Sequence, residues 1–230
     1  MNREERMSGT SVAKLNRPSD STATVPSLRE KAKAMYREAV LNAAEQVFTS
    51  HGIRGARMQD IAKHAGVSVG TVYNHFAQKE DVITALAAMH DLEIRDASCP
   101  KPEDPVDFEG AMRARHERVM RFMKRHMGFY LLAIHEGLLT DLAPSNSPLA
   151  AVREDTRIQV EDAMVELLKQ GMREGVVEEQ DPHRLKHFYT GAMHGILFAV
   201  MKDPHLDVLA EGRAALNLFL RAIRRDPHIS

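Results

Sequence analysis

Apolar residues recur at helical spacing along most of the chain, and no segment shows the strict alternation of a half-buried strand. A long helix is predicted from Ser27 to about Ser50, opened by a capping box between Ser27 and Glu30 and ended by His51 and Gly52. Further helices are predicted at residues 58–65, 69–76, 79–96, 108–127, 128–142, 149–174, 181–202 and 206–225. The pattern therefore predicts an all-α protein.

Two breaks in this pattern predict the domain organisation. Residues 1–26 are polar, contain two prolines and lack periodicity, so we expect a disordered tail. The segment 98–105 contains three prolines and interrupts the helices. We therefore expect a small helical domain at 27–97, which includes a connecting helix, and a larger helical domain at 98–230.

The segment from Met58 to Lys79 has the pattern of two short helices joined by a turn. Gly66 is placed to end the first helix in a left-handed conformation, which glycine adopts without strain. Ser68 is a good N-cap for the second helix, in which Val72 and Phe76 lie at i,i+4 spacing on the buried side. This pattern predicts a helix-turn-helix motif, whose second helix enters the major groove of DNA.

Three linked elements carry a resemblance to a known family: Ala39–Gly52, Asp60–Phe76 and Lys79–Asp81. In this order and spacing they resemble the DNA-binding domain of the TetR (tetracycline-repressor-like) family of bacterial transcriptional regulators. The resemblance implies an N-terminal three-helix domain with the helix-turn-helix motif. It also implies a larger C-terminal helical domain for ligand binding and dimerisation.

The resemblance further implies which residues contact DNA. The positions that match the family's phosphate contacts are Thr71, Tyr73, His75 and Lys79. Those that match its base contacts are Val69, Gly70 and Asn74, and Ser68 at the cap completes the motif. One departure is Ala56, which stands where the family usually has a Thr that caps the helix predicted at 58–65. Because alanine cannot cap, the start of this helix should be weaker by roughly 1 kcal/mol. We expect Arg57 to supply a phosphate contact in compensation.

Charge and composition support this interpretation. Residues 1–80 contain 12 Lys and Arg against 8 Asp and Glu, whereas residues 81–230 contain 19 against 24, so the basic excess coincides with the motif. The single cysteine, Cys99, excludes an intramolecular disulfide. No apolar stretch approaches the roughly 20 residues that span a bilayer, and no signal peptide is recognisable, so we expect a cytoplasmic protein without a membrane anchor.

The helix predicted at 181–202 is apolar on more than one side, and its small residues Gly191, Gly195 and Ala199 lie at i,i+4,i+8 spacing. One interpretation is a core hairpin with the last helix. The other, which the resemblance implies, is a homodimer in which both helices pair with their symmetry mates. The predicted dimer-interface residues are Phe188, Gly191, Gly195, Ala199, Leu216, Phe219 and Ile223.

Methionine and aromatic residues are frequent in the larger domain. They are compatible with ordinary core packing, but methionine also lines adaptable cavities, and the resemblance implies an effector site in this domain. The residues predicted to line it are Met123, Phe129, Tyr130, His135, Met164 and Met193. Four arginines, at 113, 115, 118 and 121, are interpreted as a solvated face that an anionic ligand could use.

Catalytic and metal chemistry have little support in the sequence. A helical-bundle enzyme using His135 and Glu136 for acid–base chemistry, or a scaffold without DNA affinity, are the alternatives to a regulator. His183 and His187 have the spacing of metal ligands on a helix, but a single such pair is common, and neither a metal site nor a cofactor is assigned.

The sequence thus predicts a sequence-specific regulator, most simply a repressor that a small hydrophobic or amphipathic effector releases from a palindromic double-stranded DNA operator. The effector would bias the helix at 79–96, which connects the two domains. A change in this helix would alter the distance between the two recognition helices of a dimer.

Overall fold

The structure, a computed structural model, describes residues 27–135 and 148–225, and the side chains of 27–132 and 155–225. The tail predicted at 1–26 lies outside these residues. The described residues form α-helices and one isolated β-bridge between Val177 and Arg224, which confirms the all-α fold class. The helices are α1 (Leu28–Gly55), α2 (Met58–Ala65), α3 (Val69–His75), α4 (Lys79–Ser98), α5 (Phe108–Arg125), α6 (Met127–His135), α7 (Pro148–Arg173), α8 (Pro182–Lys202) and α9 (Val208–Ile223).

Local sequence signals set the beginning and end of these helices. The capping box at the start of α1 is confirmed: the Ser27 hydroxyl accepts from the Glu30 backbone N–H at 3.2 Å, and the Ser27 N–H donates to the Glu30 carboxylate at 2.7 Å. Gly52 has a φ of 71° and breaks the helix, as predicted, although one further turn follows before α2. Aspartate side chains cap the start of α5, α8 and α9, at Asp107, Asp181 and Asp207.

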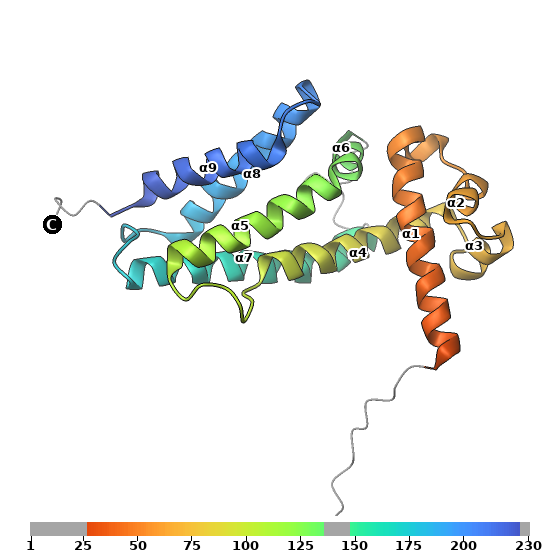
Figure 1. The fold of residues 1–230 in the computed structure, drawn as a ribbon, viewed down its shortest axis with the longest axis horizontal. Helices are drawn as coiled ribbons and strands as arrows, with labels where there is room; N and C mark the ends of the chain where they lie inside the picture. The colour runs from red at the N-terminus through yellow and green to blue at the C-terminus, as the bar shows by residue number, and fades with distance from the viewer. Residues whose placement is uncertain (1–26, 136–147, 226–230) are drawn as a thin grey trace, which may run out of the picture.

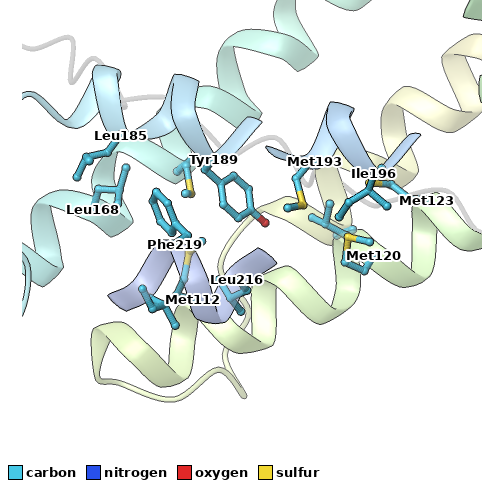
Figure 2. Packing of buried hydrophobic residues seen from close by; sticks show 14 of the residues in the cluster. Met112, Met120, Met123, Leu168, Leu185, Tyr189, Met193, Ile196, Leu216 and Phe219 are labelled. Atoms are coloured by element: carbon cyan, nitrogen blue, oxygen red, sulfur yellow. The ribbon is translucent and has the colours of Figure 1, made fainter. Parts of the chain in front are cut away.

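Two apolar clusters form the interior. The first holds α1, α2, α3 and the first half of α4 together around Phe48, Ile61, Val72 and Leu86. The second lies among α5, α7, α8 and α9. Figure 2 shows its side chains converging from these helices, among them Met112, Met120, Leu168, Tyr189, Met193 and Phe219. Gly212 brings α9 close to α5, because a Cβ at that position would lie 2.6 Å from Met120 Cε.

Helix α4 joins the two clusters. Val82 and Leu86 belong to the first cluster, whereas Ala97 near its end belongs to the second. Figure 1 shows α1, α2 and α3 at one end of the molecule and α5, α7, α8 and α9 grouped at the other, with α4 between them. None of the helices in the described ranges combines the length and the apolar character that crossing a membrane requires.

Helix α6 provides a second connection between the two ends. Phe129, on α6, packs into the first cluster, and a Cβ on Gly128 would lie 2.5 Å from the Thr49 side chain of α1. The larger domain thus contacts α1 directly as well as through α4. The remainder of the helix predicted at 128–142 lies outside the described residues.

Candidate nucleic-acid interface

The turn between α2 and α3 adopts the predicted conformation. Gly66 has a φ of 67°, and its N–H donates to the carbonyl of Lys63 while the Val67 N–H donates to that of Ala62. This left-handed residue ends α2 and turns the chain, because glycine has no Cβ to oppose it. The turn therefore places α3 across the end of α2.

Ser68 caps α3 as predicted. Its Oγ accepts from the Thr71 N–H at 3.0 Å and lies 2.8 Å from the Thr71 hydroxyl. The two side chains form a polar pair at the N-terminus of α3, where unpaired backbone N–H groups favour anions. This end of the helix can therefore bind a phosphate although neither side chain carries a charge.

Helix α3 has one buried side and one exposed side. Val72 and Phe76 are almost fully buried, and the Arg37 guanidinium of α1 lies 5.5 Å from the centre of the Phe76 ring. On the other side, Tyr73 is 48% exposed and Asn74 is exposed. The remaining predicted contacts differ in exposure: Gly70 is exposed, whereas Val69, Thr71 and His75 are half-buried.

Lys79 has a role that the sequence did not predict. Its ammonium donates to three carbonyl oxygens near the end of α1, those of Ile53 at 2.7 Å, Ala56 at 3.2 Å and Arg54 at 3.4 Å. These bonds use its three donors and tie the start of α4 to α1. In this structure they take the place of the predicted phosphate contact from the side chain.

The start of α2 corrects one prediction. The N-cap is Arg57, and its side chain makes no capping hydrogen bond, whereas Ala56 is buried and its N–H closes the end of α1 on Gly52. The cap position is thus one residue later than predicted, because Ala56 packs into the first apolar cluster. The consequence is unchanged, since this helix start lacks a side-chain cap.

Helices α8 and α9 expose apolar side chains. Phe188 is 66% exposed and Phe198 55% exposed on α8, and Leu218 is 61% exposed on α9. Between the two phenylalanines, a Cβ at Gly191 or Gly195 would meet no other atom within 4 Å. The predicted α8 residues therefore lie on an open outer face of the protomer, which also includes the exposed Ala199.

The predicted α9 contacts need correction. Leu216, Phe219 and Ile223 are buried in the second apolar cluster, against residues of the same chain. A side chain that packs inside the protomer cannot also contact a partner. The hairpin interpretation thus holds for this side of α9, and the exposed apolar residue on its other side is Leu218.

Most of the residues predicted to line an effector site lie in the second apolar cluster. Met123, Met164 and Met193 are buried in the second cluster, and Tyr130 packs against it, whereas Phe129 belongs to the first cluster. The side chain of His135 lies outside the described residues. Methionine acts here mainly as core packing, which was the alternative that the sequence left open.

A pocket of about 280 Å³ opens instead between the 98–105 segment, α5 and α7. Arg115, interpreted from sequence as solvated, is buried there: its Nε donates to the Ser98 carbonyl at 3.0 Å, and within the described structure its Nη1 and the Ser98 hydroxyl lack a hydrogen-bond partner. Desolvation lowers the pKa of Arg115. Arg115 and Ser98 line this pocket together with Lys101, Asp104, Arg118, Glu166 and Arg173, although the Arg115 Nη1 and the Ser98 hydroxyl are themselves buried.

A cluster of ionisable side chains lies where α1, α4 and the α5–α6 corner meet. Glu45 accepts from His126 at 2.9 Å and lies 3.3 Å from His90, while His126 lies 3.0 Å from Glu93. Burial raises the pKa of Glu45, but hydrogen bonds from His126 and His90 outweigh it and hold the pKa at about 2. Nothing in the local sequence pattern brings these residues together, because they are up to 81 positions apart.

Comparison with known proteins identifies the family. The family model described as bacterial regulatory proteins, tetR family, matches residues 40–86. This range contains the second half of α1, all of α2 and α3, and the start of α4. The transcriptional regulator TtgR of Pseudomonas putida is 36% identical over 78 residues, which are 34% of this chain and 37% of TtgR. The chain belongs to the TetR family of bacterial regulatory proteins. This confirms the resemblance on which the predicted DNA contacts rest.

Other relatives of this TetR-family chain extend over the larger domain. The transcriptional repressor BepR of Brucella suis is 24% identical over 209 residues, which are 87% of this chain and 98% of BepR. A Saccharomonospora viridis protein crystallised in complex with choline matches 84% of this chain and its own full length, with a TM-score of 0.67 at 17% identity. The first shows similarity in sequence beyond the motif, and the second shows a shared fold. Since the relatives are regulators, the enzyme alternative is not supported.

Proposed function

We propose that the protein is a transcriptional regulator that binds double-stranded DNA through α3. The observation that carries this proposal is the two-sided burial of α3, in which Val72 and Phe76 anchor the helix while Tyr73 and Asn74 remain exposed. The hydroxyl and amide groups on this exposed side, with the half-buried imidazole of His75 beside them, suit phosphates and base edges better than a protein core.

Individual contacts follow from position on α3. Thr71, Tyr73 and His75 are assigned to phosphates, and Ser68 supports Thr71 through its 2.8 Å hydrogen bond. Asn74 is assigned to a base edge, and Val69 to a thymine methyl. Gly70 is assigned to a base edge as well, because the absence of a side chain allows close approach of the backbone. Arg57, exposed at the start of α2, is assigned to a phosphate.

A two-fold dimer would present two α3 helices to two half-sites of a palindromic operator about one helical turn apart. The exposed face of α8 around Gly191, Gly195 and Ala199, with Phe188 and Phe198 beside it, is the proposed dimer contact. Its open glycines allow close approach of a second helix, and its phenylalanines supply apolar area. Residues 98–230 would thus form the dimerisation domain, and 27–97 the DNA-binding domain.

A small molecule would regulate this activity from the pocket between the 98–105 segment, α5 and α7. An anionic group of an amphipathic effector would pair with the cationic side chains that line the pocket, Lys101, Arg118 and Arg173. Because the pocket borders the end of α4, occupancy can bias the helix that carries the DNA-binding domain. A coupling of about 1–3 kcal/mol would change operator occupancy roughly 5- to 150-fold. Such a regulator would act in the cytoplasm, as a repressor.

Selection of bound DNA tests the proposal. The full-length protein is mixed with random duplexes, and the retained fragments are sequenced over several rounds. We expect enrichment of a palindrome, with a changed half-site for Asn74→Ala and an unchanged one for the control Asn42→Leu, an exposed position on α1. Absence of any enriched sequence for the wild-type protein contradicts the proposal.

A further inference from the structure

The ionisable cluster at the junction of the two domains has the composition of a metal site. Glu45 comes from α1, His90 from α4, and His126 from the corner between α5 and α6. One potential ligand atom of each lies within 4.8 Å of those of the other two. Three elements that are distant in sequence thus place two imidazoles and a carboxylate around one point.

The distances are close to those of a coordinated ion. Around a tetrahedral zinc with bonds of about 2.0–2.1 Å, neighbouring ligand atoms lie about 3.3 Å apart. Here one oxygen, Glu45 Oε2, lies 3.2 Å from His126 Nδ1 and 3.3 Å from His90 Nε2. All three ligand atoms lie within 4.8 Å of one another, so shifts of about 1 Å would bring them to the spacing of a tetrahedral site.

Glu93 supplies a feature that a chance cluster seldom has. Its carboxylate lies 3.0 Å from Nε2 of His126, the ring nitrogen opposite to the one that faces Glu45. Metal-bound histidines usually donate their second N–H to such a carboxylate, which fixes the tautomer and the orientation of the ring. Arg125 lies 3.5 Å from the same Glu93 oxygen and holds that carboxylate in turn.

The surroundings are partly apolar and enclosed. His90 and His126 are almost fully buried, with ring centroids 4.1 Å apart, and Phe129 meets the His90 ring edge-on at 4.8 Å. Burying two carboxylates beside two imidazoles is costly unless positive charge compensates them. Glu45 and Glu93 remain partly exposed, which leaves a route from solvent.

We propose that Glu45, His90 and His126 bind one divalent transition-metal ion, with Glu93 as the positioning residue for His126. Imidazole and carboxylate together suit zinc, cobalt or nickel, whereas calcium and magnesium prefer oxygen ligands alone. Three protein ligands leave a further position for water or another small ligand. The ion would join α1 to α4 and to the α5–α6 corner.

The regulatory consequence rests on the proposed function. Glu45 lies one helical turn before Thr49, the residue that α6 approaches at Gly128. An ion at the junction would therefore fix α1, which packs on the helix-turn-helix, relative to the larger domain. Occupancy would change the affinity for the selected DNA at least about fivefold.

Cobalt binding tests the site directly. Full-length protein without a histidine tag is treated with EDTA, exchanged into metal-free buffer and titrated with Co²⁺, whose visible absorption reports coordination by nitrogen. We expect one equivalent that Zn²⁺ displaces, and loss of the absorption in Glu45→Gln and His126→Gln. The matched control is His183→Gln with His187→Gln, an exposed pair on α8 with metal-ligand spacing, which should bind as the wild type does.

Variants and controls keep the outcome clear. Circular dichroism and thermal unfolding without metal show whether each variant folds, and Glu93→Gln, which leaves all three ligands in place, should weaken Co²⁺ binding about 10- to 100-fold. Equal binding by wild type and ligand variants, or loss only in the α8 pair, overturns the site. A wild-type protein whose properties change with pH but that gives no cobalt absorption also overturns it.

Binding to the selected DNA is then measured with EDTA and with Zn²⁺. Cobalt binding with unchanged DNA affinity overturns the regulatory consequence. If no duplex is bound under either condition while the cobalt result holds, the proposed function fails and the metal site stands.

Discussion

The exposed sides of α3 and α8 differ in chemistry although each helix is anchored by the same kind of apolar contacts. On α3, the exposed residues are Tyr73 and Asn74, which keep hydrogen bonds with water until another polar surface replaces it. On α8, Phe188 and Phe198 are more than half exposed, at a free-energy cost of about 25 cal/mol per Å² of apolar surface. The first suits reversible contact with a polyanion, and the second suits a lasting contact with protein.

This comparison indicates that substitutions on the two faces should have separate effects. A change on α3 should affect DNA affinity and leave assembly intact, whereas a change on α8 should affect assembly first. The interior behind α8 also holds a buried histidine, His116, which is hydrogen-bonded to Tyr189 of the second apolar cluster. The outer face of each helix, the interior behind α8 and the start of α2 can therefore be tested by separate substitutions.

The largest effect is expected for Tyr73→Ala combined with His75→Ala. A hydrogen bond to a charged group contributes about 1.5–3 kcal/mol, so loss of two phosphate contacts should weaken binding to every duplex at least about 100-fold. Fluorescence anisotropy with the selected operator measures this. Sedimentation should show the same dimer as the wild type, and Asn42→Leu, at an exposed position on α1, serves as the control. Unchanged affinity of the double variant would remove α3 from the interface.

The next effect concerns the interior behind α8. Burial lowers the pKa of His116 to about 4, and its Nδ1 shares a 2.8 Å hydrogen bond with the Tyr189 hydroxyl. Below about pH 6.5, His116 is protonated in the unfolded chain but stays neutral in the folded chain, so stability falls as the pH drops from 6.5 towards 4. The total loss in the free energy of unfolding is about 3 kcal/mol at most.

Urea unfolding at pH 7 and pH 5 measures this difference. His116→Asn keeps a polar partner for Tyr189 but cannot titrate, so its loss of stability between the two pH values should be smaller than that of the wild type by about 1–2 kcal/mol. Comparing the two proteins cancels the other titrating groups. Parallel pH dependence of both proteins would contradict a neutral, buried His116.

The third effect tests the outer face of α8. A Cβ at Gly195 would meet no neighbouring atom within 4 Å, so Gly195→Leu should leave the fold of the protomer intact, but a second helix at this position would be overpacked by about 1–3 kcal/mol. The dimer dissociation constant should therefore rise roughly 5- to 150-fold by analytical ultracentrifugation. Asn42→Leu, at a position on α1 that is also exposed, is the control. A wild-type protein that sediments as a monomer at micromolar concentration would exclude the proposed dimer.

Sequence could predict the parts of this molecule that depend on local signals. The capping box at Ser27, the left-handed Gly66 and the Ser68 cap each act within one turn, so a few residues are enough to identify them. Which residues of α3 are buried and which are exposed also follows from their spacing in the sequence. The assignment of Ala56 as the cap was one residue early, because which of two adjacent residues turns inward depends on packing against the rest of the domain.

Contacts between distant segments could not be predicted in the same way. Leu216, Phe219 and Ile223 formed a good apolar stripe, but a stripe does not say whether its partner is the same chain or a second copy. Arg115 had the spacing of a solvated residue, yet it is buried beneath the 98–105 segment. The cluster of Glu45, His90 and His126 likewise depends on the tertiary fold.

The smallest effect distinguishes the two short helices of the motif. Helix α3 has a side-chain cap at Ser68, whereas Arg57 at the start of α2 caps nothing. Arg57→Ser would provide a hydroxyl for the first-turn amides and should stabilise the protein by about 0.5–1 kcal/mol in urea unfolding. The same change removes the proposed phosphate contact, so operator affinity should fall at low salt and the salt dependence of binding should become shallower by about one ion. The control Arg57→Ala removes the charge without adding a cap, and should lose affinity without gaining stability. Equal stability of the Ser and Ala variants would show that α2 does not need a cap, and unchanged affinity of both would show that Arg57 does not contact DNA.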